Sequence, residues 1–529
     1  MKLIILILAL FQFFSPVSTQ EKLERYESFK IERYNIKLEI NDSTDFIKGK
    51  TGILISLINP VEEVIMDLAS TDAGDTGMTV DSILKNGILV DHIHRENKLH
   101  ISVFETDTGI IKYDVYYQGQ AGEGIIISEN MHGEKTFFAD NWPNNAHNWF
   151  PCIDHPSERA LVDFAITAPS HYQVIATGLL TKKVTLPGKR ITHYWSSSVP
   201  VPVKVMAFAA AGFAVQYHND IDGIPYSNWV YPQNIEEGFH DFAITPDIIR
   251  FFTDLIGPYP FEKIANVQST TRYGGMEKAG NIFYHERSVK GDRSIEPTMV
   301  HEMAHQWFGN SVSEADWPHL WLSEGIATWL TDIYIEQHYG TDKLKEKLIT
   351  YRNNVIDYSR VHLAPIVDYH ANEPADLLNP NTYQKASWIL HMLGEKIGRP
   401  TLIKGIVEYY DQFKHNSASS YDFVEVIENV SGVDLNEFAD DWLYSAGHPV
   451  ISLSTSYSNG TFLMELTQVQ QHKMAFTFPV EIKLILEDES EVSFAFDILF
   501  RRHEFVLKLP SEPVEVIIDP DIKLLFEQV

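Results

Sequence analysis

The segment 301–305 reads His-Glu-Met-Ala-His, and Glu324 follows His305 after eighteen intervening residues. On an α-helix, residues four apart lie on one face, so the imidazoles of His301 and His305 can bind one metal ion. Two imidazoles and one carboxylate are a ligand set that zinc takes in hydrolytic enzymes. We therefore predict one Zn²⁺ per chain, bound by His301, His305 and Glu324, with Glu302 as the base that takes a proton from an activated water.

The residues around this segment predict two helices. Ser294 is a suitable N-cap, Pro297 fits a first helical turn, and Gly309 is a suitable stop. Apolar residues recur at helical spacing in both segments, at Val300, Met303, Ala304 and Trp307 and again at Ile326, Trp329, Leu330 and Ile333. This spacing leaves the histidines on a neighbouring face of the first helix and places Glu324 in the first turn of the second.

Further motifs give the chain a resemblance to the zinc aminopeptidases of the aminopeptidase N type, which have a thermolysin-like catalytic domain. The resemblance covers roughly residues 120 to 450. It rests on Gly257-Pro258-Tyr259-Pro260-Phe261, Gly274-Gly275-Met276-Glu277-Lys278, Asn281-Ile282-Phe283-Tyr284, Leu320-Trp321-Leu322-Ser323-Glu324-Gly325-Ile326-Ala327 and Tyr383-Gln384-Lys385-Ala386.

The resemblance implies roles for several of these residues. Tyr383 matches the tyrosine that stabilises the transition state, because a phenol O–H beside the metal can donate to a developing oxyanion. Gly274, Gly275 and Met276 would let a substrate peptide approach the backbone closely. Glu277 would bind the free α-ammonium of that peptide, which is the contact that distinguishes an exopeptidase from a general peptidase.

The chain departs from the family at two positions beside this anchor. Lys278 stands where the family has asparagine, and its ammonium can pair with Glu277, compete for the anchor or point away. The family also has a second amine anchor upstream of its Pro-Cys-x-Asp-x-Pro motif, which is recognisable here at residues 151–156. Asp140 is the residue we predict to replace that second anchor.

The order of periodic patterns predicts a multidomain α+β protein. Residues alternate between apolar and polar from Tyr34 to about Val215, helical periods follow from about His218, and alternation returns after residue 449. The predicted parts are a signal peptide at 1–19, an N-terminal β domain at 20–217, a thermolysin-like catalytic domain at 218–447 and a small C-terminal β-sandwich at 448–529.

Composition limits the partners and the location. The formal charge of −30 excludes a nucleic-acid binder, since binding phosphates needs a basic face. Lys2 and the apolar run 3–14 are typical of a secretory signal peptide, and the run is too short to span a bilayer as an N-terminal anchor, which is the alternative. Cys152 is the single cysteine, so we expect an exported protein of a bacterial periplasm or medium that needs no disulfide. We expect no stable membrane insertion, and the sequence does not determine the oligomeric state.

The predicted function is a zinc metallo-aminopeptidase that acts on peptides with a free N-terminus. The alternatives are a zinc endopeptidase or an epoxide hydrolase of the same fold, and a relative that binds peptides without turnover. Glu302 and Tyr383 disfavour the last alternative, because a pure binder needs neither a base nor an oxyanion donor.

Overall fold

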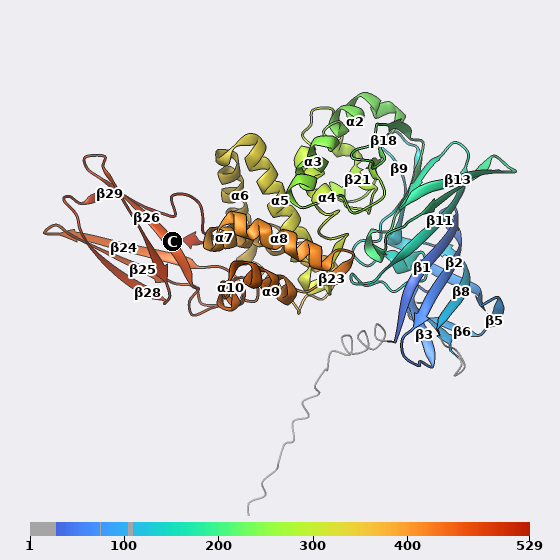
Figure 1. The fold of residues 1–529 in the computed structure, drawn as a ribbon, viewed down its shortest axis with the longest axis horizontal. Helices are drawn as coiled ribbons and strands as arrows, with labels where there is room; N and C mark the ends of the chain where they lie inside the picture. Colours follow the sequence, from blue (N-terminus) through green and yellow to red (C-terminus); the bar gives the residue numbers. More distant parts are fainter. Residues whose placement is uncertain (1–27, 73, 75, 104–108) are drawn as a thin grey trace, which may run out of the picture.

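A computed structural model describes residues 28–72, 74, 76–103 and 109–529. The predicted signal peptide at 1–19 lies outside these residues. Seen in Figure 1, an N-terminal β region, a helical middle region and a C-terminal β region follow one another along the long axis of the molecule. The expected multidomain α+β fold, with β regions on both sides of a helical region, is confirmed.

The N-terminal region is built from long strands whose alternate residues are buried. In β1, for example, Ile36 and Leu38 are buried while Lys37 and Glu39 are exposed. Its main sheet has the order β13-β14-β11-β1-β2-β8-β4-β5, and β15 pairs with β11. The bounds are β1 Phe29–Glu39, β2 Phe46–Leu57, β4 Gly77–Lys85, β5 Ile88–Val90, β8 Ile110–Gln120, β11 Arg159–Pro169, β13 Leu179–Leu186, β14 Arg190–Ser196 and β15 Val201–Pro202.

Two smaller sheets complete this region. One has the order β12-β16-β10-β9 and the other β3-β7-β6. The bounds are β3 Glu63–Asp67, β6 His92–Arg95, β7 Lys98–Ser102, β9 Ile125–Glu129, β10 Lys135–Ala139, β12 Gln173–Ala176 and β16 Phe208–Ala211. Strand β10 matters for the site because Asp140 follows it directly.

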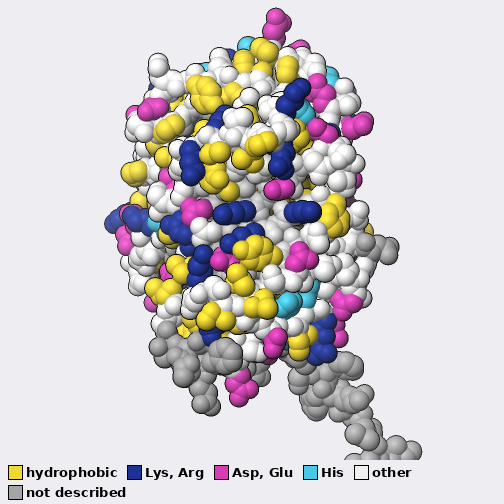
Figure 2. Space-filling model, turned by 90° about the vertical axis from the view of Figure 1, so that its right-hand side faces the viewer, with side chains coloured by type: hydrophobic (Ala, Val, Ile, Leu, Met, Phe, Trp, Pro, Cys, Tyr) yellow, Lys and Arg dark blue, Asp and Glu magenta, His cyan; other side chains and the backbone are white. Residues whose placement is uncertain are grey.

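The surface of the N-terminal region mixes cations with apolar groups. Figure 2 shows Lys and Arg side chains among hydrophobic ones on this end of the molecule. The main sheet contributes to this mixture, since the Lys50 ammonium lies 4.9 Å from the centre of the Tyr116 ring and the Lys182 ammonium 4.3 Å from that of Tyr194.

The middle region combines a sheet with packed helices. The sheet has the order β17-β18-β19-β21-β20, which leaves β20 at one edge. Its strands are β17 Ala214–Tyr217, β18 Tyr226–Val230, β19 Ile264–Ser269, β20 Gly275–Met276 and β21 Ile282–His285, and β22 Val312–Glu314 pairs with β23 Asn416–Ala418 apart from it. The helices are α2 Ile235–Phe242, α3 Thr245–Leu255, α4 Glu296–Ala304, α5 Trp321–Tyr339, α6 Thr341–Ser359, α7 Ala386–Ile397, α8 Arg399–Phe413, α9 Ser420–Ser431 and α10 Asn436–Trp442.

The C-terminal region consists of two facing sheets. They have the orders β28-β25-β24-β30 and β27-β26-β29, and aromatic rings join them, with the Phe496 and Phe505 centroids 3.8 Å apart. The strands are β24 Val450–Ser458, β25 Thr461–Gln468, β26 Phe478–Leu486, β27 Glu491–Ile498, β28 Arg502–Lys508, β29 Pro513–Ile518 and β30 Glu527–Gln528.

The domain limits predicted from the sequence stay predictions. The limit at 217/218 falls between β17 and β18, which pair from Ala214 with Val230 to Tyr217 with Ser227. In the described part of the chain, none of the helices combines the length and the apolar character needed to cross a membrane. The Cys152 side chain is buried.

Candidate metal centre and the pocket around it

Helices α4 and α5 bring the two halves of the predicted zinc site together. Helix α4 buries Met299, Val300 and Met303, and Pro297 lies in its first turn as expected. The helix is shorter than predicted: it starts at Glu296 and ends at Ala304, so His305 is its C-cap residue. Glu324 lies in the first turn of α5, in agreement with the sequence pattern.

The turn after α4 holds the two helices close together. Gly309 has a positive φ of 118°. A Cβ at this position would collide with Ser323 Oγ on α5 and would crowd the His305 ring. Because only glycine tolerates both the conformation and the approach, the turn can pack against α5 and fix the distance between His305 and Glu324.

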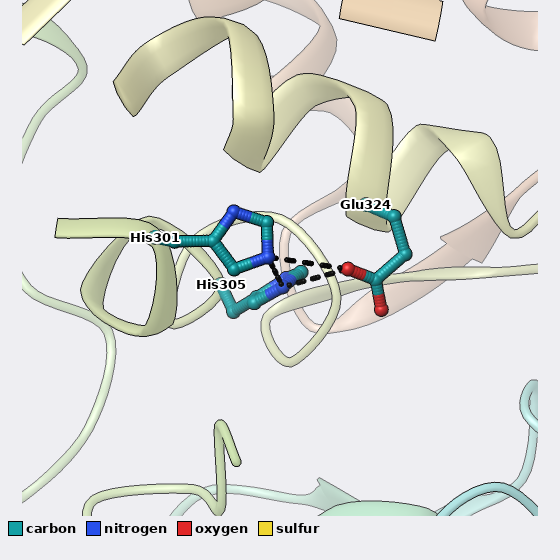
Figure 3. A group of neighbouring side chains, drawn as sticks. All are labelled: His301, His305 and Glu324. Atoms are coloured by element: carbon teal, nitrogen blue, oxygen red, sulfur yellow. Dashed lines mark hydrogen bonds and ion pairs between the residues drawn. The ribbon is translucent and has the colours of Figure 1, made fainter. Parts of the chain in front are cut away.

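His301, His305 and Glu324 face a common point, as Figure 3 shows. The Nε2 atoms of His301 and His305 are 3.1 Å apart, and they lie 3.3 and 3.1 Å from Glu324 Oε2. His305 Nδ1 lies 2.9 Å from the Phe308 carbonyl oxygen, to which it can donate, so its Nε2 lone pair is directed toward the other two groups. This donor set fits zinc, because two imidazole nitrogens and a carboxylate oxygen point at one position.

The electrostatics of the three residues favour a positive charge between them. Burial lowers the pKa of His305, but the carboxylates of Glu324, Glu277 and Glu302 together outweigh burial and raise this pKa to about 10. Burial alone raises the pKa of Glu324, and the two histidines reverse this effect and hold it well below its ordinary value. A buried carboxylate that stays ionised needs a cation beside it, which a metal ion can provide.

Glu302 lies against the edge strand β20. Its side chain is buried, and burial raises its pKa well above the ordinary value, with the Glu277 and Glu324 carboxylates adding to the rise. A Cβ at Gly275 would collide with the Glu302 carboxylate, whereas a Cβ at Gly274 would meet no atom of the described residues within 4 Å. Gly275 is therefore the residue that lets the strand approach Glu302.

Tyr383 reaches the same pocket from a π-helical turn, Asn381–Lys385, which precedes α7. Its ring lies over that of His301, with centroids 6.1 Å apart and an interplanar angle of 27°. Burial raises the pKa of Tyr383 well above its ordinary value, so the phenol keeps its proton and remains a donor at neutral pH.

The pocket has a volume of about 400 Å³ and joins most of the predicted residues. Glu277 lines it, and its buried Oε1 has no hydrogen-bond partner among the described residues. Residues that the sequence reasoning did not assign to the site are Trp142, Tyr273, Thr298 and Leu378. Gly274, Gly275, Met276, Glu277, His301, Glu302, His305, Glu324 and Tyr383 complete the wall. Two of these residues could have been predicted from their position in the sequence. Tyr273 directly precedes the Gly274 motif, and Thr298 lies one helical turn before His301.

Asp140 differs from the expectation. Its carboxylate is buried and lies 3.3 Å from Lys278 Nζ, and it is not part of the pocket wall. Lys278, whose orientation the sequence left open, therefore points away from the pocket and toward Asp140. The reason is local: Glu277 and Lys278 are neighbours in the chain, but only Glu277 faces the pocket.

A larger cleft of about 590 Å³ lies elsewhere, between helices α7 and α10 and strands β26 and β27. None of the predicted site residues lines it. Size alone therefore does not identify the functional site, whereas the converging ligands and buried carboxylates do.

Comparison with known proteins identifies relatives for both the N-terminal β region and the middle region. A model of the peptidase family M1 domain matches residues 240–442, and a model of the peptidase M1 N-terminal domain matches residues 30–203. Mitochondrial aminopeptidase 2 of Saccharomyces cerevisiae is 24% identical over 459 residues, covering 80% of this chain and 46% of the relative. Glutamyl aminopeptidase of Sus scrofa is 24% identical over 377 residues, covering 67% of this chain and 40% of the relative.

The fold is also found in a solved structure. The crystal structure of Legionella pneumophila aminopeptidase A in complex with aspartic acid aligns with a TM-score of 0.81 and 17% identity, covering 95% of this chain and 60% of that one. The chain spans about half the length of the curated relatives it matches.

The metal centre can be tested without any substrate. We expect the wild-type chain to retain about one zinc ion after dialysis, and the Glu324→Gln variant to lose most of it because the charged ligand is gone. Glu302→Gln is the matched control: it makes the same change one residue from a ligand and should keep its zinc. Elemental analysis of the three proteins provides the readout, and full zinc retention by Glu324→Gln would remove Glu324 from the ligand set.

Proposed function

The chain belongs to the M1 family of peptidases, and from this premise we propose that it is a zinc-dependent aminopeptidase that removes single residues from the N-terminus of peptides. One observation carries the proposal. The Glu277 carboxylate lines the same pocket as His301, His305 and Glu324, and one of its oxygens is buried with no hydrogen-bond partner in the part of the chain that the structure describes. A buried carboxylate in this state is a binding site for a cationic group, and the α-ammonium of a peptide is such a group.

The position of β20 supports binding of an extended peptide. This strand pairs with β21 and stands at the edge of its sheet. A peptide can add to such an edge as a further strand, with its backbone held by main-chain hydrogen bonds. Glu277 follows β20 directly, so the peptide's first residue would lie at the end of the strand, where its ammonium meets the carboxylate.

The hydrolytic step needs a base and an oxyanion donor, and both line the pocket. Zinc bound by His301, His305 and Glu324 would supply Lewis-acid activation of the attacking water and of the scissile carbonyl. Glu302, with its raised pKa, would accept the proton of that water and pass it to the leaving amine. Tyr383, which keeps its phenolic proton, would donate to the oxyanion.

One further part of the proposal, the location of the protein, rests on the sequence. We propose that residues 1–19 direct export of the protein. An endopeptidase of the same fold is the main competing activity, and it differs in one structural requirement: it does not need Glu277 to bind an ammonium.

The close approach of Gly275 to Glu302 predicts an effect of one added methyl group. Gly275→Ala should keep the fold, because the Glu302 side chain can move aside, but it should lower kcat by about 10-fold or more by displacing the base. Gly274→Ala adds the same methyl group where no described atom lies within 4 Å, so it should leave Glu302 in place and lower kcat less than Gly275→Ala does. Steady-state hydrolysis of an alanine anilide measures both. Equal kcat values for the two variants would contradict the placement of Glu302 as the base.

Removing the Tyr383 hydroxyl should slow the reaction without disturbing the fold. Tyr383→Phe keeps the ring on His301 and deletes one donor, and we expect kcat to fall about 10²–10³-fold, in line with other oxyanion donors. Zinc content and thermal stability should stay unchanged. A normal kcat would show that Tyr383 serves packing alone.

The chain end of the substrate tests the role of Glu277. A free-amine peptide should be cleaved ~30- to several-thousand-fold faster in kcat/KM than its N-acetylated twin, because acetylation leaves the buried carboxylate unpaired. In Glu277→Gln this ratio should fall toward one, mainly through loss of activity on the free-amine peptide. Mass spectrometry resolves the products, and internal fragments as first products of the wild-type enzyme would indicate an endopeptidase.

A further inference from the structure

A lysine of the protein directly follows the proposed amine-binding glutamate in the chain. The Lys278 side chain is fully buried, at 0% relative exposure, and follows Glu277 directly in the chain. Its Nζ lies 3.3 Å from Asp140 Oδ1 and 3.4 Å from the Lys204 carbonyl oxygen. The protein thus carries an internal ammonium of the same chemical kind as the substrate group that Glu277 is proposed to bind.

Asp140 connects the N-terminal β region to this lysine. It follows β10, its backbone N–H donates to the Gly124 carbonyl at 2.9 Å, and its carboxylate is buried at 4% relative exposure. Burial raises the pKa of Asp140, while the Lys278 ammonium opposes the rise and the Glu277 carboxylate adds to it. The exposed Arg272 guanidinium also lowers the pKa of Asp140, but less than Lys278 does. Arg272 forms an ion pair with Glu123 at 2.7 Å.

We infer that Asp140 is a positioning residue that holds the Lys278 ammonium behind the pocket wall, so that the Glu277 carboxylate stays available to the α-ammonium of the substrate. The inference rests on the proposed function, because it assigns a reason for the selectivity of the same site. It gives Asp140 a role through Lys278 in place of direct contact with the substrate amine.

The opposite charges of Asp140 and Lys278 make the effects of the two residues interdependent. With both present, the Asp140–Lys278 pair is neutral and Glu277 supplies the net negative charge of this part of the pocket. Without Asp140, the buried ammonium of the residue that follows Glu277 would be uncompensated and would oppose a second ammonium in a poorly screened site. Without both, the pair's net charge is again zero. The loss caused by removing Asp140 should therefore be recovered by removing Lys278 as well.

The test is a double-mutant cycle with a binding readout. Alaninamide, which has a free ammonium, is titrated by calorimetry into the zinc-loaded wild type and into Asp140→Asn, Lys278→Met and the double variant. We expect the Kd to rise at least about tenfold in Asp140→Asn, because an uncompensated buried charge would remain on the residue that follows Glu277. The double variant should return to within about threefold of wild type, and Lys278→Met should bind as tightly as wild type or more tightly.

Two controls make the outcome specific. N-acetylalaninamide, which lacks the ammonium, should show no such order among the variants. Glu123→Gln makes the same carboxylate-to-amide change at an exposed pair that leaves Arg272 positive, and its effect should stay below about twofold because water screens it.

Either of two results would overturn the inference. If Asp140→Asn and the double variant weaken alaninamide binding equally, or if Lys278→Met weakens it as much as Asp140→Asn does, then Asp140 and Lys278 serve structure alone. If Asp140→Asn does not fold, Lys278→Met still decides, because the inference predicts a Kd no higher than that of the wild type and a clearly higher Kd would overturn it. A wild type that does not prefer the free amine would contradict the proposed function itself, whereas a wild type that does, combined with an absent rescue, would overturn only this inference.

Discussion

The site depends on one constraint, the burial of several carboxylates at the contact of helices α4 and α5 with strand β20. Glu277, Glu302 and Glu324 are each at most 6% exposed and line one pocket. Ionised carboxylates removed from water are stable only beside positive charges or strong donors. The pocket is therefore organised by the positive groups that can neutralise its carboxylates, and the group that fits differs from one carboxylate to the next.

This view separates the roles of residues that look alike. Glu324 faces the two imidazoles, which fits a metal ion. Glu302 has its pKa raised by burial and by its acidic neighbours, which suits a group that takes up a proton. Glu277 faces the pocket and has an oxygen with no hydrogen-bond partner among the described residues, which suits a substrate ammonium, and Asp140 already has the Lys278 ammonium. In the proposed mechanism, carboxylates thus take the roles of metal binding, proton transfer, substrate binding and positioning according to what lies opposite each.

Sequence reasoning found the parts of this arrangement that depend on local spacing. The i, i+4 histidines, the position of Glu324 in the first turn of α5 and the alternating strands of the N-terminal region follow from helical and strand periods, and the structure has them. It misjudged the end of α4, because Gly309 ends the following turn rather than the helix itself. It did not reveal the π-helical turn at Tyr383, which has no signature in residue type.

The sequence could not predict which side chains of distant segments contact one another. Asp140 and Lys278 are 138 positions apart, and only the packing of β10 against the loop after β20 shows that they meet. Trp142 and Leu378 line the pocket for the same kind of reason. A pattern in one segment indicates which face is buried, but not which residue of another segment it will contact.

The central claim is that two helices place His301, His305 and Glu324 around one zinc ion next to the Glu277 carboxylate. A crystal structure of the zinc-loaded protein, with diffraction data collected on both sides of the zinc absorption edge, tests it most directly. The account predicts one strong anomalous peak about 2.0–2.2 Å from His301 Nε2, His305 Nε2 and a Glu324 carboxylate oxygen. A zinc-loaded crystal with no peak at this position, or with its peak at another group of residues, would contradict it.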